Sequence, residues 1–149
     1  KLDKFNFKHL VFSTSSLTLD EIKQCIDNLQ GVDFTILHCV CLYPTPVEKV
    51  NLSSIELLKT LHDNIGLSDH SNSLLISKQA ILQGIDMLEK HFTILNKEKT
   101  RDGQVSLNPA ELREINQFRK YSREQQFRIL NTFNDTQKFN HKYYRGRFE

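Results

Sequence analysis

Two histidines, His70 and His91, are the side chains whose type and position most favour chemistry. They are twenty-one residues apart in the sequence. Each comes at the end of an apolar stretch that has the composition of a buried strand. A third such stretch, Phe34–Cys39, is followed by Tyr43-Pro44-Thr45-Pro46. Strands that each end in polar residues, separated by helical sequence, are typical of the catalytic face of a parallel α/β barrel. Imidazoles from neighbouring strand ends can share one divalent metal ion.

Alternation along the strands indicates which side chains accompany the histidines. Successive residues of a strand point to opposite faces, so Ser68 shares a face with His70 and Glu89 shares one with His91. We therefore expect His70 and His91 to converge on one ion. Glu89 is the candidate to orient His91 from outside the metal's own ligands.

Four strand–helix units must position these residues. Helical crossovers of twenty to thirty residues require parallel strands. The sequence predicts an α/β fold over residues 1–130, the parallel (βα)4 half of a TIM-type (βα)8 barrel, followed by a basic, aromatic tail over residues 131–149. The expected strands are His9–Ser13, Phe34–Cys39, Ile65–Asp69 and Ile85–Thr93, and the expected helices begin near Thr18, Asn51, Ser73 and Asn108.

Local signals fix several helix ends. Thr18 and Glu21 form a capping box, and Asn108 precedes a proline at the first helical position. Gly31 and Gly84 are placed to end the first and third helices. The long last helix has an apolar stripe that we expect to be buried: Leu112, Ile115, Phe118 and Tyr121.

Composition bounds the class of protein. The chain has 149 residues with 38% hydrophobic and 26% charged residues, which is ordinary for a soluble domain. A complete eightfold barrel usually needs about 250 residues. No apolar run approaches the ~18 residues of a membrane span, and residues 1–4 lack the apolar core of a signal peptide. Three cysteines, an odd number, fit a reducing compartment, so we expect a cytoplasmic protein without a membrane partner.

Charge gives little reason to expect a nucleic acid. The net charge is +2, although residues 119–149 carry eight basic and three acidic side chains with aromatic residues between them. Such a tail is more often a solvated helix end than a nucleic-acid surface, and we predict no nucleic-acid partner. We expect His38 to be a polar residue of the barrel layer, and His62 and His141 to lie on the surface.

Three motifs together point to a known family. Y-P-T-P at residues 43–46, G-L-S-D-H at 66–70 and E-K-H-F-T at 89–93 resemble the barrel domain of the sialic acid synthase (N-acetylneuraminate synthase) family, over Phe12 to Pro109. The resemblance implies the C-terminal half of a catalytic barrel. It implies an enzyme that condenses phosphoenolpyruvate with an N-acetylated hexose, giving a nine-carbon 2-keto sugar acid and phosphate. In the family the other half supplies lysines and an acid, and we expect a homodimer in the full-length context.

The resemblance also implies roles for individual residues. His70 and His91 would hold a divalent metal, Mn²⁺ first, with Mg²⁺ or Co²⁺ as alternatives. Ser13 and Ser68 would donate to phosphoenolpyruvate, while Tyr43 and Asp102 would contact the sugar. Cys41 departs from the family pattern, which often has asparagine or serine there.

Three readings of function stay open at this point. The first is the synthase, acting on N-acetylmannosamine or a bacterial analogue. The second is an inactive half-barrel that serves as an assembly or binding module, and the third is another metal-dependent barrel aldolase. We expect the 149 residues alone to be inactive, and to aggregate, stay molten or pair, because one face of Ile36, Leu37, Leu67 and Leu88 would be poorly covered.

Overall fold

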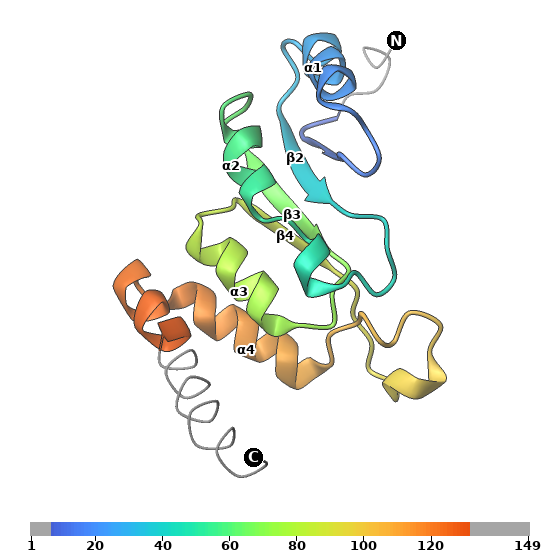
Figure 1. Cartoon of the computed structure of the whole chain (residues 1–149), viewed down its shortest axis with the longest axis vertical. Helices are drawn as coiled ribbons and strands as arrows, with labels where there is room; N and C mark the ends of the chain where they lie inside the picture. Colours follow the sequence, from blue (N-terminus) through green and yellow to red (C-terminus); the bar gives the residue numbers. More distant parts are fainter. Residues whose placement is uncertain (1–6, 132–149) are drawn as a thin grey trace, which may run out of the picture.

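The computed structural model describes residues 7–131, in which four parallel strands alternate with helices (Figure 1). This confirms the predicted (βα)4 arrangement. Every strand and helix expected from the sequence is present. The elements are β1 (Leu10–Ser13), α1 (Leu19–Asn28), β2 (Phe34–Cys39), η2 (Val47–Lys49), α2 (Ser53–Lys59), β3 (Ile65–Asp69), α3 (Leu74–Leu82), β4 (Met87–Lys90), η3 (Lys97–Lys99) and α4 (Pro109–Lys120).

The strands pair in sequence order, β1-β2-β3-β4. Cys39 pairs with Ser68, and Ser68 pairs with Glu89, so the polar ends of three strands lie level across the sheet. Strand β4 is shorter than the predicted Ile85–Thr93. Beyond Lys90 the chain leaves the ladder with β3, and Phe92 instead forms a parallel bridge with Leu107.

One face of the sheet is covered by helices, and the apolar core lies between them. Figure 1 shows α2 and α3 on the same side of the sheet, α2 against β2 and β3, and α3 against β3. Ile36, Ile65 and Leu67 point to this side and meet helix residues such as Ile55 and Ala80. All five side chains are essentially inaccessible to solvent, so this layer supplies most of the apolar burial of the described part.

The other face would line the interior of a barrel. Its residues alternate with the core residues along each strand: Val11, Ser13, Leu37, Cys39, Gly66, Ser68, Met87 and Glu89. A side chain at Gly66 would collide with Leu37 Cδ2 and with the carbonyl oxygen of Met87. The glycine therefore leaves room for the Leu37 side chain to pack over the neighbouring strand.

The prediction that Ile36, Leu37 and Leu67 lie poorly covered is wrong, because they are 0%, 1% and 1% exposed. Ile36 and Leu67 face the helices, and Leu37 lies across Gly66. Leu88 is half-buried against the core. The exposed apolar side chain of the inner face is instead Val11, at the β1 edge.

Most helix ends follow the predicted signals. Thr18 and Glu21 form the capping box of α1, and Asn108 and Glu111 form that of α4. Asn51 differs from expectation: its side chain bonds the hydroxyls of Ser53 and Ser54, while α2 begins after Leu52 without a side-chain cap. Asn51 has a positive φ, and its side-chain amide is taken up by the two serine hydroxyls.

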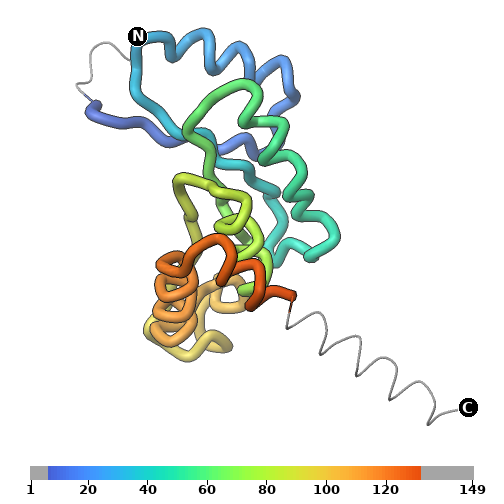
Figure 2. Tube along the Cα trace, turned by 90° about the vertical axis from the view of Figure 1, so that its left-hand side faces the viewer, coloured from blue at the N-terminus to red at the C-terminus, as the bar shows by residue number. Residues whose placement is uncertain are grey.

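Residues 123–131 form a further helical segment, which lies against α4 (Figures 1 and 2). Gln126 donates to the carbonyls of Phe118 and Tyr121 and so caps the end of α4. In the predicted stripe of α4, Ile115 and Phe118 are buried, whereas Leu112 and Tyr121 are 36% exposed. The predicted tail beyond residue 131, with His141, lies outside the described residues.

His62 is not a free surface residue. Its ring stacks on Phe34, with centroids 4.0 Å apart, and its Nε2 bonds the Phe34 carbonyl. His38 is buried, at 7% exposure, but the prediction that it belongs to the barrel layer is wrong, because it shares the helix-facing side of β2 with Ile36. It points toward the helices, where its Nε2 bonds the carbonyl of Val50 at 2.6 Å. No helix among residues 7–131 is long and apolar enough to span a membrane.

Candidate active site

His70 and His91 stand side by side, directly after the ends of β3 and β4. Their ring centroids are 5.4 Å apart and the rings meet edge to face. His70 is buried, at 7% exposure, whereas the side chain of His91 is 34% exposed. The parallel pairing of Asp69 with Lys90 brings the two histidines together, as strand alternation predicts.

The partners of His70 define its tautomer. Its Nδ1 lies 3.3 Å from the carbonyl oxygen of Val40, which can only accept a hydrogen bond. Nδ1 therefore carries the proton, and the lone pair is on Nε2. Nε2 faces the Tyr43 hydroxyl at 3.0 Å. A metal-binding imidazole needs this arrangement, in which one ring nitrogen is fixed by a backbone carbonyl and the other is left to bind the metal.

Tyr43 is placed by the loop that follows β2. The Thr45 amide donates to the His70 carbonyl, and the Thr45 hydroxyl donates to the carbonyl of Leu42 at 2.8 Å. These bonds fasten the loop to the end of β3. Burial, and then the nearby Cys41 and Cys39, raise the pKa of the Tyr43 phenol, so it keeps its proton and donates to His70 at neutral pH.

Asp102 comes from the loop that follows β4. Its Oδ2 lies 3.8 Å from Nδ1 of His91. The Ser106 hydroxyl donates to the Asp102 carbonyl, and the Leu107 amide donates to that of His91, which folds the loop back onto the strand end. Gly103 allows this turn, because any side chain there would collide with the Lys97 carbonyl.

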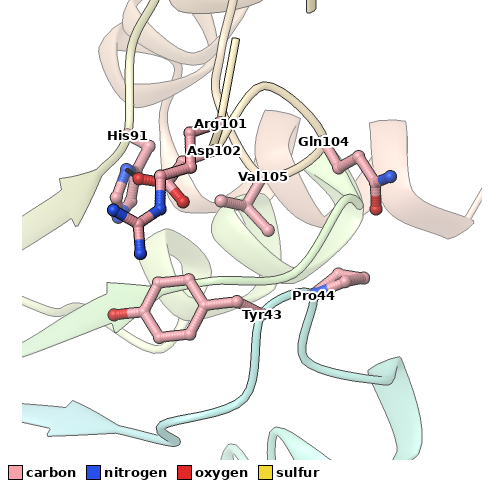
Figure 3. A pocket seen from close by; sticks show the side chains of 7 residues that line it. All are labelled: Tyr43, Pro44, His91, Arg101, Asp102, Gln104 and Val105. Atoms are coloured by element: carbon pink, nitrogen blue, oxygen red, sulfur yellow. Dashed lines mark ion pairs between the residues drawn. The ribbon is translucent and has the colours of Figure 1, made fainter. Parts of the chain in front are cut away.

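These two loops line an open cavity of about 620 Å³. Figure 3 shows Tyr43 and Pro44 on one side, with His91, Arg101 and Asp102 facing them from the other. Its remaining lining residues are Gln104 and Val105. The structure thus brings together three residues predicted from the sequence, Tyr43, His91 and Asp102, with His70 in contact beneath Tyr43.

Ser68 and Glu89 form a second group beside the histidines. The Ser68 hydroxyl donates to Oε1 of Glu89 at 2.6 Å. The predicted role of Glu89 in orienting His91 stays a prediction, since the hydrogen bond that the structure gives its carboxylate comes from Ser68. The carboxylate that faces His91 is that of Asp102.

Ser13 lies apart from this group. It pairs with Leu37 in the sheet, two residues before Cys39, and it is exposed at the β1 edge. Ser13 is not among the residues that line the cavity. Its role toward phosphoenolpyruvate stays a prediction from the resemblance.

Two of the three free cysteines stand near the site. Cys39 is buried, with Sγ 3.9 Å from Nδ1 of His70, while Cys41 is exposed and bonds the Ser15 hydroxyl. Burial raises the pKa of the Cys39 thiol, which therefore stays protonated and a weak ligand at neutral pH.

The side chains at the site supply two of the ligands that a divalent cation would need. His70 Nε2 and the His91 ring supply two imidazole nitrogens, and the cavity leaves room for water or substrate. Within residues 7–131, no group of three or more His, Cys, Asp or Glu side chains is placed to hold a metal ion.

The fold and the paired histidines define a class, parallel α/β barrels that carry polar residues at their strand ends. The NeuB family model matches residues 3–126. The chain therefore belongs to the NeuB family, as the resemblance of its motifs predicted.

Three relatives illustrate the match. The N,N'-diacetyllegionaminic acid synthase of Campylobacter jejuni is 34% identical over 76% of this chain and 35% of its own length. The N-acetylneuraminate-9-phosphate synthase of Drosophila melanogaster is 33% identical over 71% of this chain and 30% of its own. The crystal structure of the spore coat polysaccharide biosynthesis protein SpsE of Bacillus subtilis superposes with a TM-score of 0.69 at 32% identity, over 80% of this chain and 35% of that one.

The chain spans about a third of the length of the curated relatives it matches. Its four parallel strands thus correspond to half of the TIM-type barrel of such synthases, which confirms the predicted fold class.

Sequence reasoning missed two features of the cavity. One is the hydrogen bond between Tyr43 and His70, which depends on a loop path that no periodicity encodes. The other is Arg101, which lines the cavity next to Asp102. An arginine directly before a residue already predicted to bind sugar was the available signal.

Proposed function

We propose that this chain forms the C-terminal half of the catalytic barrel of a synthase. The enzyme would condense phosphoenolpyruvate with an N-acetylated hexose, to give a nine-carbon 2-keto sugar acid and phosphate. The observation that carries the proposal is the meeting of His91, Tyr43 and Asp102 at one cavity, with His70 in contact with the first two. Family membership supports a sugar-acid synthase, while the acceptor sugar and the cofactor belong to the proposal alone.

Each residue has a task in this reaction. His70 Nε2 and His91 would hold a divalent cation, Mn²⁺ first, which supplies Lewis acidity for the acceptor's aldehyde. Tyr43 and Asp102 would bind sugar hydroxyls, one as a donor and the other as an acceptor. Ser68, whose hydroxyl now donates to Glu89, would turn toward phosphoenolpyruvate. The remaining phosphoenolpyruvate contacts would come from the other half of the barrel.

Metal binding tests the histidine pair. In a complete barrel containing this chain, His70→Ala or His91→Ala should abolish Mn²⁺ retention, measured by electron paramagnetic resonance after dialysis. His62→Ala is the matched control, because this histidine packs against Phe34 away from the cavity. Full metal retention and turnover in His91→Ala would overturn the assignment.

Substrate dependence tests the reaction. Phosphate should be released only when phosphoenolpyruvate, an N-acetylated hexose and a divalent cation are all present. With water labelled in oxygen, the label should enter the keto acid, because the C–O bond of phosphoenolpyruvate breaks. Label in the phosphate would reject this mechanism. A condensation without phosphoenolpyruvate would favour an aldolase, and no turnover by the complete barrel would favour a binding module.

A further inference from the structure

Arg101 is the cationic side chain of the cavity. Figure 3 shows its guanidinium directed into the cavity, between His91 and Tyr43. Among residues 7–131 it makes no ion pair and no side-chain hydrogen bond. By contrast, Arg128 pairs with Glu124, and Lys97 on the same loop pairs with Glu111 at 2.6 Å. The guanidinium therefore has five donors to offer a ligand.

The charges around Arg101 favour an anion. The Asp102 carboxylate is directed to His91, at 3.8 Å, and the Tyr43 phenol is neutral because its pKa is raised by burial and by the groups around it. Pro44, Gln104 and Val105 add no charge to the wall. A divalent cation at the histidines would add further positive charge to the same cavity, and an anionic substrate group would offset it.

We propose that Arg101 binds a phosphate ester on the acceptor sugar, and so selects a phosphorylated N-acetylhexose over the neutral one. A planar guanidinium pairs with phosphate through two parallel hydrogen bonds. The inference rests on the proposed function, since it takes the cavity as the acceptor's binding place. Arg101 shares that cavity with Tyr43 and Asp102, the two residues proposed to contact the sugar, whereas Ser13 and Ser68 do not line it.

Carbon counting is consistent with this selection. Three carbons from phosphoenolpyruvate and six from a hexose make nine, so a phosphate on C6 of the hexose becomes a 9-phosphate in the product. The name of the Drosophila relative gives a 9-phosphate as its product. The name of the Campylobacter relative gives a product without a phosphate. On the proposal that Arg101 binds a phosphate ester, this chain would act on the first kind of acceptor.

Steady-state kinetics of a complete barrel containing this chain test the inference. The acceptors compared are N-acetylmannosamine 6-phosphate and N-acetylmannosamine, at saturating phosphoenolpyruvate. Arg101→Gln should lower kcat/KM for the phosphorylated sugar roughly tenfold to a hundredfold, and leave that for the neutral sugar nearly unchanged. Arg101→Lys should retain part of the preference. Arg113→Gln, on the exposed side of α4, is the matched control.

Two further outcomes would overturn the inference. One is an equal loss of kcat/KM with both acceptors in Arg101→Gln. The other is that this variant raises only the KM for phosphoenolpyruvate. Binding of the sugar phosphate alone, followed by phosphorus NMR line broadening, separates this inference from the proposed function. Weaker binding by Arg101→Gln than by Arg113→Gln would support the anion site even without turnover. Equal binding by the two variants would overturn it.

Discussion

At the scale of single residues, Lys90 and Asp69 stand directly before the two histidines and form a buried ion pair. Their side chains are 4% and 0% exposed, and Lys90 Nζ lies 3.0 Å from Oδ2 of Asp69. Lys90 also donates to the carbonyl of Ser71, and Asp69 accepts from the Ser77 hydroxyl at 2.6 Å. Burial lowers the pKa of Lys90, while Asp69 opposes this shift. The pair therefore links the two histidine-bearing strand ends from behind the site.

Removing one partner of this pair should destabilise the fold. Lys90→Met leaves the Asp69 carboxylate buried and uncompensated, which costs about 3–5 kcal/mol in the free energy of unfolding. Urea unfolding of a complete barrel, followed by circular dichroism, measures this loss. Adding Asp69→Asn should return part of it. Lys23→Met, which breaks an exposed pair with Asp20, should cost less than about 1 kcal/mol. A similar small loss for Lys90→Met would contradict this account.

Residue-level prediction succeeded where strand period decided the outcome. The alternation of β3 and β4 correctly placed His70 beside His91. It also indicates that Asp69 and Lys90 point the opposite way, but not that they form an ion pair. That pairing depends on the register between two strands, which the sequence of either strand leaves undetermined.

At the scale of elements, the start of α4 holds the loop that carries Asp102. Glu111 accepts from the Asn108 amide and from Lys97, which lies on that loop. Burial raises the pKa of the Glu111 carboxyl. The hydrogen bonds from Lys97 and Asn108 outweigh burial and, with the charges of Lys97 and Lys90, hold this pKa below its ordinary value.

This shift predicts a pH dependence of stability. A carboxyl with a lowered pKa in the folded state stabilises the protein above its ordinary pKa of 4.5, and this stabilisation is lost as the pH falls through the folded value. Glu111→Gln should cost about 1 kcal/mol at neutral pH and should reduce the loss of stability toward acid. Urea unfolding between about pH 3 and pH 7 measures this, with Glu48→Gln as an exposed control. An unchanged acid profile would refute the role of Glu111.

Element boundaries were predictable where one signal dominates. The bounds of β2 and β3 match the prediction, because each is an apolar run ended by polar residues. The capping boxes at Thr18 and Asn108 are also confirmed. Prediction failed at Asn51, where serine hydroxyls compete for the amide, and at the end of β4, where Leu107 takes over the pairing. Both failures involve partners that a local pattern cannot rank.

At the scale of the whole molecule, the sheet has two ends that a closed barrel would join. On β1, Val11 is 41% exposed on the inner face. Beyond β4 the edge is partly covered by the Phe92–Leu107 bridge, but Ile94 and Leu95 next to it are 79% and 63% exposed. Open strand edges beside exposed apolar side chains favour association. The class of fold was predictable from the sequence, whereas these surfaces needed the coordinates.

The 149-residue chain by itself should therefore not behave as a folded, active monomer of 17.5 kDa. We expect self-association or a molten state, because burying the inner face and the two edges requires a second body, either the other half of a barrel or another copy. Size-exclusion chromatography with light scattering measures the mass, and a phosphate-release assay measures activity. Val11→Lys should reduce association by placing a charge at the open edge, whereas Leu57→Lys, on the outer side of α2 at 49% exposure, should not. A well-folded monomer that turns over substrate would show that the half-barrel is complete as a catalytic unit, and would refute the shared-barrel architecture.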